Sequence, residues 1–266
     1  MAITRLLNNK AFVLFVILSA FFIGNTLVAE FIGFKIFSLE KALGFTPLNF
    51  KLLGIEGLGF NLTAGAILWP VVFVMTDLIN EYYGPKSVRF LSYLAIVIVL
   101  YAFLMIYGAI NLPPNEWWQF SSGIIENNPG DSVSDMNLAF RKVMGAGLWI
   151  IIGSMVAFLI GQITDVLIFH RIKKITGEKN LWLRATGSTL VSQLIDSYIV
   201  LVVAFYIGAD WDIVRVLAIG TVNYIYKFLM AILLTPAIYL AHFGIERYLG
   251  SELAEQMKTD AAGIKE

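Results

Sequence analysis

Thr76-Asp77-Leu78-Ile79-Asn80-Glu81-Tyr82-Tyr83-Gly84 places two carboxylates and an amide at the end of an apolar segment, residues 62–75. An ionisable side chain in the middle of a membrane helix costs about 2.5–3.5 kcal/mol, and less towards the ends of the helix. On a helix, Asp77, Asn80 and Glu81 fall at positions i, i+3 and i+4, so they share one face within reach of one small solute. The pattern therefore predicts a polar site inside a membrane-spanning helix.

The composition is that of an integral membrane protein. The chain has 266 residues, of which 58% are hydrophobic and 14% charged, and its mean hydropathy is +0.77. Soluble proteins average about 45–50% apolar and about 25% charged residues. The chain has no cysteine, which excludes disulfides, thiolate metal sites and a cysteine nucleophile. The first apolar run, from Ala11 to about Phe34, is too long for a signal-peptide core, so we expect a retained helix.

Apolar segments long enough to cross a hydrocarbon core of about 30 Å occur six times. They are residues 11–33, 63–83, 88–110, 145–169, 186–208 and 213–240. With both ends of the chain in the cytoplasm, 12 of the 19 lysines and arginines lie inside, as membrane proteins prefer. The sequence thus predicts one all-α domain over residues 1–266, multi-pass in the cytoplasmic (inner) membrane, with N-in/C-in topology. We expect an external hairpin or interfacial segment at 34–62, a long external loop at 111–143 and a polar, frayed cytoplasmic tail at 249–266.

Polar side chains recur at membrane depth in five of the six predicted spans. They are Asn25 and Glu30 in the first span; Asp77, Asn80 and Glu81 in the second; Gln162 and Asp165 in the fourth; Ser188, Ser192, Gln193 and Asp196 in the fifth; and Asn223 and Lys227 in the sixth. Each amide alone is explained equally well by an interhelical hydrogen bond worth about 0.6–2 kcal/mol. The carboxylates as a set, however, exceed the single lysine among them, so the sequence favours a polar interior that binds a solute.

Several chemistries fit these residues poorly. The two histidines, His170 and His242, lie at the inner ends of helices, so a Ser–His hydrolase is poorly supported. A metal site built from Asp and Glu would need closely spaced oxygen ligands, and no phosphate-binding loop for ATP occurs. An anion would call for Arg or Lys within the bundle, where only Lys227 occurs. The residues suit a small uncharged heterocycle such as a purine, because carboxylates and amides accept its N–H groups and aromatic rings stack on its face.

Residues 70–84, with the element Asp-x-x-Asn-Glu-x-x-Gly, closely resemble the signature of the queuosine-precursor transporter family, also called the vitamin uptake transporter family. The block 184–197 and the segment 161–165 resemble two further signatures of that family. The resemblance implies a six-helix inner-membrane protein, similar to the substrate-binding subunits of energy-coupling-factor importers, which is not an enzyme. It implies transport of 7-cyano- or 7-aminomethyl-7-deazaguanine, precursors of the tRNA base queuosine. The long loop 111–143 departs from the family pattern.

The residues and the resemblance together give a set of expected substrate contacts. They are Asp77, Asn80, Glu81, Gln162, Asp165, Ser188, Gln193, Asp196 and Asn223, with Arg184 and Lys227 as charge partners. Asp196 with Gln193 is expected to recognise the N–H edge and carbonyl of the ligand, and Arg184 to partner a carboxylate at the inner boundary. The expected partners are a 7-deazapurine and the lipid bilayer, with no nucleic acid, metal or cofactor, and a homodimer is left open.

Two alternatives remain. One is a substrate-capture subunit of a vitamin or nucleobase importer that needs separate ATPase partners. Such a subunit would present an Ala-x-x-x-Ala surface on its first helix for docking, and the span 11–33 does not show this pattern. The other is a membrane-embedded enzyme, which conversion of the precursor by the reconstituted protein would reveal.

Overall fold

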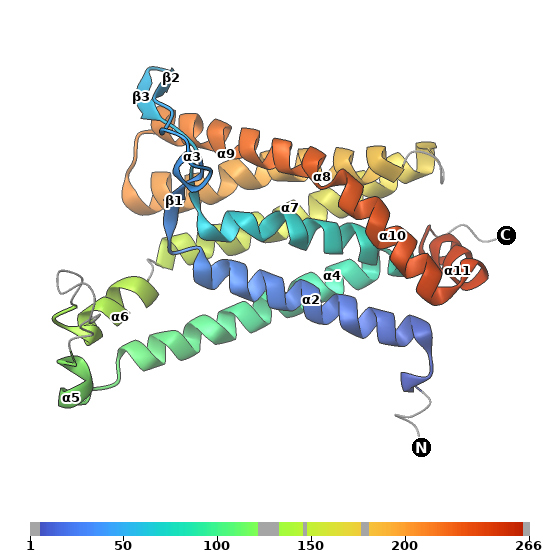
Figure 1. Cartoon of the computed structure of the whole chain (residues 1–266), viewed down its shortest axis with the longest axis horizontal. Helices are drawn as coiled ribbons and strands as arrows, with labels where there is room; N and C mark the ends of the chain where they lie inside the picture. Colours follow the sequence, from blue (N-terminus) through green and yellow to red (C-terminus); the bar gives the residue numbers. More distant parts are fainter. Residues whose placement is uncertain (1–5, 122–132, 146–147, 177–180, 263–266) are drawn as a thin grey trace.

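The computed structural model describes residues 6–121, 133–145, 148–176 and 181–262. Within them the protein is an all-α membrane protein, with five helices long and apolar enough to cross a membrane. The long helices run alongside one another in a bundle (Figure 1). They are α2 (Lys10–Ile32), α4 (Trp69–Ile110), α7 (Leu148–Thr176), α8 (Leu181–Leu201) extended by the π-helical turn η3 (Val202–Ile207), and α9 (Ile213–Leu233). The shorter helices are α3 (Leu39–Ala42), α5 (Glu116–Gln119), α6 (Met136–Met144), α10 (Thr235–Leu249) and α11 (Ser251–Ala262).

Helix α4 consists of two legs that meet at Gly84. A straight helix of its 42 residues would be about 63 Å long, twice the thickness of a hydrocarbon core. Gly84 instead has φ 76° and ψ 174°, a conformation open chiefly to glycine, and Pro85 begins the second leg. The chain doubles back at this point (Figure 1). The two legs correspond to the predicted spans 63–83 and 88–110.

The first leg starts later than the sequence indicated. Residues expected to be helical from 63 onward form the end of strand β4 (Asn61–Thr63) and a short 3₁₀ helix, η1 (Ala64–Ile67), before α4 begins at Trp69. Gly65 lies so close to α2 that a Cβ atom there would be 2.4 Å from the carbonyl oxygen of Ala29. The entry to α4 is therefore set by backbone packing against α2, which the apolar composition of this segment does not reveal.

The connection before α4 folds into two small antiparallel sheets. Strand β1 (Ile36–Ser38) pairs with β4, with Phe37 opposite Leu62, and β2 (Phe50–Leu52) pairs with β3 (Ile55–Leu58). The expected hairpin between 34 and 62 is thus present. Its strands lie at the end of the bundle opposite α11, as do α5 and α6 (Figure 1).

The predicted span 213–240 is divided in two. Helix α9 ends at Leu233, and α10 begins at Thr235 and runs in a different direction (Figure 1). Pro236, in the first turn of α10, has no N–H to continue the α9 hydrogen-bond ladder. The hydroxyl of Thr235 donates to the carbonyl of Ala231 across this break, at 3.1 Å.

The C-terminal tail, expected to be a frayed helix, forms helix α11, which packs against the rest of the protein. Leu253, Ala254 and Met257 share one face of α11, and Ala254 is 2% exposed. This face covers the turn at Gly84, where a Cβ atom would lie 3.2 Å from the carbonyl oxygen of Ala261.

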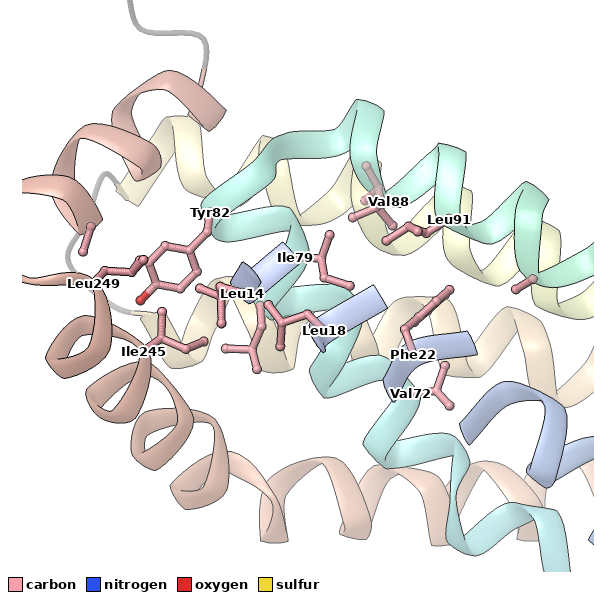
Figure 2. Close-up of a cluster of buried hydrophobic side chains, with 14 of the residues drawn as sticks. Leu14, Leu18, Phe22, Val72, Ile79, Tyr82, Val88, Leu91, Ile245 and Leu249 are labelled. Atoms are coloured by element: carbon pink, nitrogen blue, oxygen red, sulfur yellow. The ribbon is translucent and has the colours of Figure 1, made fainter. Parts of the chain in front are cut away.

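One apolar cluster joins the N-terminal half of the chain to its C-terminal helices. Figure 2 shows side chains of α2, both legs of α4 and α10 meeting in it. The labelled residues are Leu14, Leu18, Phe22, Val72, Ile79, Tyr82, Val88, Leu91, Ile245 and Leu249. The hydroxyl of Tyr82 is hydrogen-bonded to Nδ1 of His242 at 2.9 Å. This cluster fixes the first leg of α4, and with it the stretch 76–84.

Glycines allow α7, α8 and α9 to approach closely. A Cβ atom on Gly153 of α7 would be 3.0 Å from the carbonyl oxygen of Val200 on α8, and one on Gly220 of α9 would be 2.8 Å from the ring of Tyr198. Small residues at such crossings let membrane helices pack backbone to backbone. The close approach brings polar side chains of α7, α8 and α9 into one region.

Candidate substrate-binding cleft

A cleft lies between the first leg of α4, α8, α9 and the start of α10. It contains about 340 Å³ of empty space, which includes the open solvent at its mouth. The residues lining it are Pro70, Phe73, Val74, Asp77, Thr186, Thr189, Gln193, Lys227, Ala231, Leu234 and Ile238. The cleft is thus mainly apolar, with a few polar groups placed on facing helices.

Asp77 is the carboxylate of the cleft. It is 2% exposed, and the hydroxyl of Thr189 lies 3.5 Å from its Oδ2 atom. The same hydroxyl lies 3.5 Å from Oδ1 of Asp165, which Ser192 also approaches at 3.3 Å. One hydroxyl proton serves only one of the two carboxylates at a time. Asp77 thus places a buried carboxylate in the wall of the cleft.

Gln193 faces Asp77 from α8. Its side chain is 2% exposed, and its Oε1 atom accepts no hydrogen bond from the residues that the structure describes. A buried amide oxygen without a donor costs about 1–3 kcal/mol, so Gln193 has an acceptor ready for an N–H group that enters the cleft.

Lys227 places a cation at the edge of the cleft and forms an ion pair with Asp196. Asp196, which was expected to contact the substrate, is not among the residues lining the cleft, whereas its partner Lys227 is. Lys227 is thus paired with a carboxylate in the structure.

The other expected contacts lie outside the lining, and several of them hydrogen-bond between helices. Asn80 Oδ1 is 2.8 Å from Nε2 of His170, and Gln162 Oε1 accepts a hydrogen bond from Thr76 at 2.9 Å. Ser188 is fully buried beside Asp165, and Asn223 is half-buried one turn before Lys227.

Glu81 is held by a lysine that the sequence analysis did not assign to it. Lys173 Nζ lies 3.2 Å from Glu81 Oε1, and the two side chains are 5% and 0% exposed. The expected partner at this boundary was Arg184, whose side chain lies outside the described residues.

Sequence reasoning missed the neutral part of the lining. Thr186 and Thr189 precede Gln193 by seven and four residues on α8, and Pro70, Phe73 and Val74 precede Asp77 by seven, four and three on α4. Residues at these spacings share one face of a helix. Extending the faces of Asp77 and Gln193 by two turns would have found all five.

Metal binding gains no support from this arrangement. Within residues 6–121, 133–145, 148–176 and 181–262, no group of three or more Asp, Glu, His or Cys side chains is placed to hold an ion. The carboxylates instead lie beside hydroxyl groups, as Asp77 and Asp165 do, or form ion pairs with lysines, as Glu81 and Asp196 do.

Comparison with known families decides the family of the chain. The family model named "Putative vitamin uptake transporter" matches residues 63–241, a range that contains every residue lining the cleft. The chain belongs to the vitamin uptake transporter family. The resemblance seen in residues 70–84 is thereby confirmed, and the chain is a transporter and not an enzyme.

Curated relatives of this vitamin uptake transporter extend over most of its length. A "Probable queuosine precursor transporter" of Bacillus subtilis is 29% identical over 79% of this chain and 85% of its own. A protein of the same name from Haemophilus influenzae is 26% identical over 77% of this chain and 82% of its own. The "Queuosine precursor transporter" of Escherichia coli is 26% identical over 76% of this chain and 82% of its own. No solved structure matches the chain.

Proposed function

We propose that this protein imports queuosine precursors, 7-cyano- or 7-aminomethyl-7-deazaguanine, across the cytoplasmic membrane by exposing the cleft alternately to its two sides. The names of the three relatives support this substrate class. The observation that carries the proposal is the cleft itself, in which the carboxylate of Asp77 and the amide of Gln193 project from different helices beside the ring of Phe73.

The chemistry of the cleft matches a flat nitrogen heterocycle. A 7-deazaguanine presents adjacent N–H groups on one edge, which a carboxylate such as Asp77 accepts. Gln193 Oε1 offers a second buried acceptor, and its amide N–H₂ group can donate to the carbonyl of the ligand. Phe73 offers an aromatic face, while Thr186 and Thr189 supply hydroxyl groups. The amide, hydroxyl and aromatic groups give hydrogen bonds and stacking without requiring a charged substrate.

We further propose six membrane crossings with N-in/C-in topology. The two legs of α4 would be the second and third crossings, and the turn at Gly84 would lie on the cytoplasmic side with α11. The reversal of the chain at Gly84 and the lysines and arginines at that end support this arrangement. Similarity to the substrate-binding subunits of energy-coupling-factor importers stays a prediction.

Counterflow in liposomes containing only the purified protein tests the function. Vesicles preloaded with unlabelled 7-cyano-7-deazaguanine should take up the labelled compound faster than vesicles without protein, and guanine should compete poorly. The same measurement with 7-aminomethyl-7-deazaguanine ranks the two precursors. Absence of exchange with both compounds, in protein that remains folded, would contradict autonomous transport. Exchange that appears only after addition of ATPase partners would establish the substrate-capture alternative.

A further inference from the structure

Glu30 is a further carboxylate inside the bundle that the proposed substrate site does not use. It continues the buried stripe of α2, because Leu14, Leu18, Phe22 and Thr26 precede it at intervals of four residues and are all buried. The stripe faces the other helices, so Glu30 points into the bundle and not into the lipid. Its Oε1 atom accepts a short hydrogen bond from the hydroxyl of Ser154 on α7.

The surroundings of Glu30 contain no cation bound to it. Within the part of the chain that the structure describes, no lysine, arginine or histidine forms an ion pair with this carboxylate. Ser154 faces it from α7, Asp196 acts on it electrostatically from α8, and Lys227 of α9 is engaged by Asp196. Helix η1, packed against α2, has no charged side chain, and α4 contributes the ring of Phe103 next to Phe31.

A carboxylate in this setting is suited to exchange a proton. An ionised carboxylate without a cation is disfavoured in apolar surroundings, whereas the neutral acid is tolerated. The negative charge of the neighbouring Asp196 strengthens this preference, and it does so more when Lys227 neutralises Asp196 less. The protonation of Glu30 therefore depends on where the ammonium group of Lys227 lies.

Lys227 connects this carboxylate to the cleft. It lines the cleft and holds Asp196 at the same time. A substrate that attracts the ammonium group towards the cleft weakens its pairing with Asp196, and the less neutralised Asp196 then favours the protonated form of Glu30. Because linkage is reciprocal, a proton on Glu30 must raise the affinity for substrate by the same factor.

We propose that Glu30 carries the proton whose inward movement drives substrate uptake, with Asp196 and Lys227 transmitting substrate binding to it. This inference rests on the proposed import function. The proton binds a carboxylate oxygen of Glu30 from the external side together with substrate, and it is released to the cytoplasm when substrate leaves. No bond other than O–H forms or breaks.

Binding measurements in detergent test the linkage. The dissociation constant of 7-cyano-7-deazaguanine for the wild-type protein should fall as the pH is lowered from about 8 to 5. Glu30→Gln, which resembles the protonated acid, should bind at the low-pH affinity across this range, and Glu30→Asp should keep a pH response. Glu56→Gln, which removes an exposed carboxylate of β3, is the matched control and should behave as wild type. A pH response of Glu30→Gln equal to that of the wild type would overturn the inference.

Transport measurements in liposomes distinguish coupling to protons from substrate transport itself. An acid exterior should make wild-type vesicles accumulate substrate, by up to about tenfold per pH unit if one proton accompanies each neutral molecule. A protonophore should abolish accumulation, and addition of substrate should acidify the lumen. Glu30→Gln should lose accumulation and acidification while it still exchanges substrate in counterflow.

Three results would count against the proposal in different ways. Wild-type counterflow without any response to a pH gradient, or accumulation driven by sodium instead, would overturn the coupling and leave the import function standing. Absence of wild-type counterflow would overturn the import function and the coupling with it. If Glu30→Gln does not fold, the wild type and Glu30→Asp still decide the question, since substrate-dependent acidification is required of both.

Discussion

Gln162 and Gln193 are buried amides on neighbouring helices with different tasks. Gln162 is 1% exposed and ties α7 to Thr76 of α4, whereas Gln193 is 2% exposed and lines the cleft with an unpartnered oxygen. Both are followed three residues later by an aspartate, so the sequence alone presents them as equivalents. The difference arises from which helix each one faces.

Replacing each glutamine by leucine should separate binding from stability. Gln193→Leu removes a polar group from the lining of the cleft, so substrate affinity should fall by about tenfold or more with little change in thermal stability. Gln162→Leu should keep wild-type affinity but lose about 0.6–2 kcal/mol of stability with its interhelical hydrogen bond. Isothermal titration and thermal unfolding of the same preparations measure both. Equal loss of affinity in the two variants would remove Gln193 from the site.

The Glu81–Lys173 pair gives a second prediction for single residues. Both side chains are buried, at 0% and 5% exposure, so Lys173→Met leaves the carboxylate of Glu81, at the end of the first leg of α4, without its lysine. Breaking a buried pair in this way typically costs about 3–5 kcal/mol. Lys173→Met should therefore lower the unfolding temperature sharply, and adding Glu81→Gln should restore part of the loss. A single variant as stable as wild type would show that the pair is not required.

The roles of Asp77 and Glu81 could be predicted only in part. Their spacing of four residues correctly puts them on one face, but it also puts them one turn, about 5.4 Å, apart along the helix. At that difference in depth Asp77 meets Thr189 of α8, and Glu81 meets Lys173 of α7. Which residue of α7 or α8 lies opposite each carboxylate depends on how far these helices are shifted along one another. The spacing of apolar residues in a membrane helix does not reveal that shift.

The turn at Gly84 gives a prediction at the level of the helices. Gly84→Ala should destabilise the protein, because φ 76° strains an L-residue by about 1–2 kcal/mol and the new Cβ would lie 3.2 Å from the carbonyl of Ala261. Gly24→Ala in α2, where nothing lies within 4 Å of the added atom, is the matched control and should be neutral or slightly stabilising. Thermal unfolding in detergent compares them, and equal melting temperatures would contradict a sharp turn at Gly84.

The small sheet formed by β1 and β4 should become less stable in acid. Burial alone would raise the pKa of Glu40, but hydrogen bonds from the N–H of Phe60 at 2.7 Å and the hydroxyl of Ser38 at 2.9 Å help to lower it below its ordinary value of 4.5. Because the folded pKa is the lower one, the stabilisation is complete above the unfolded pKa and is lost as pH falls through the folded pKa. The Phe60 segment of Glu40→Gln should then exchange its amide hydrogens faster than wild type at pH 7.

Glu40→Gln and wild type must be compared at the same pH, since the rate of amide hydrogen exchange itself depends on pH. The difference between Glu40→Gln and wild type should shrink in acid, as the wild-type carboxyl becomes protonated below its ordinary pKa of 4.5. Glu56→Gln breaks only an exposed pair with Lys51 and should show no effect at pH 7. A difference between Glu40→Gln and wild type that persists unchanged in acid would exclude the carboxylate charge as its cause.

Helices were easier to predict than their ends. Length and apolarity located each long helix, because a membrane leaves little choice but helical backbone. The ends depend on single residues and on packing: Gly84 turns α4, Pro236 separates α10 from α9, and contact with α2 keeps residues 64–67 out of α4. Tertiary contacts of this kind also explain α11, whose few apolar residues are enough to cover the turn at Gly84.

For the molecule as a whole, the decisive question is which elements share a side of the membrane. The sheets β1–β4 and β2–β3 lie at one end of the bundle, and the Gly84 turn and α11 lie at the other (Figure 1). The N-in/C-in proposal puts the sheets outside and α11 inside. Since the chain has no native cysteine, single cysteines introduced at exposed positions report topology without further changes.

Lys51→Cys, Lys86→Cys and Glu255→Cys place one thiol on β2, one beside the Gly84 turn and one on α11. A membrane-impermeant maleimide applied to spheroplasts should label only Lys51→Cys, and all three should react after the membrane is permeabilised. Lys86→Cys is the most informative, because a straight α4 would bury this position in lipid, where a thiol stays unreactive under both conditions. Labelling of Glu255→Cys in intact spheroplasts would invert the topology, and with it the direction in which a proton on Glu30 could drive the substrate.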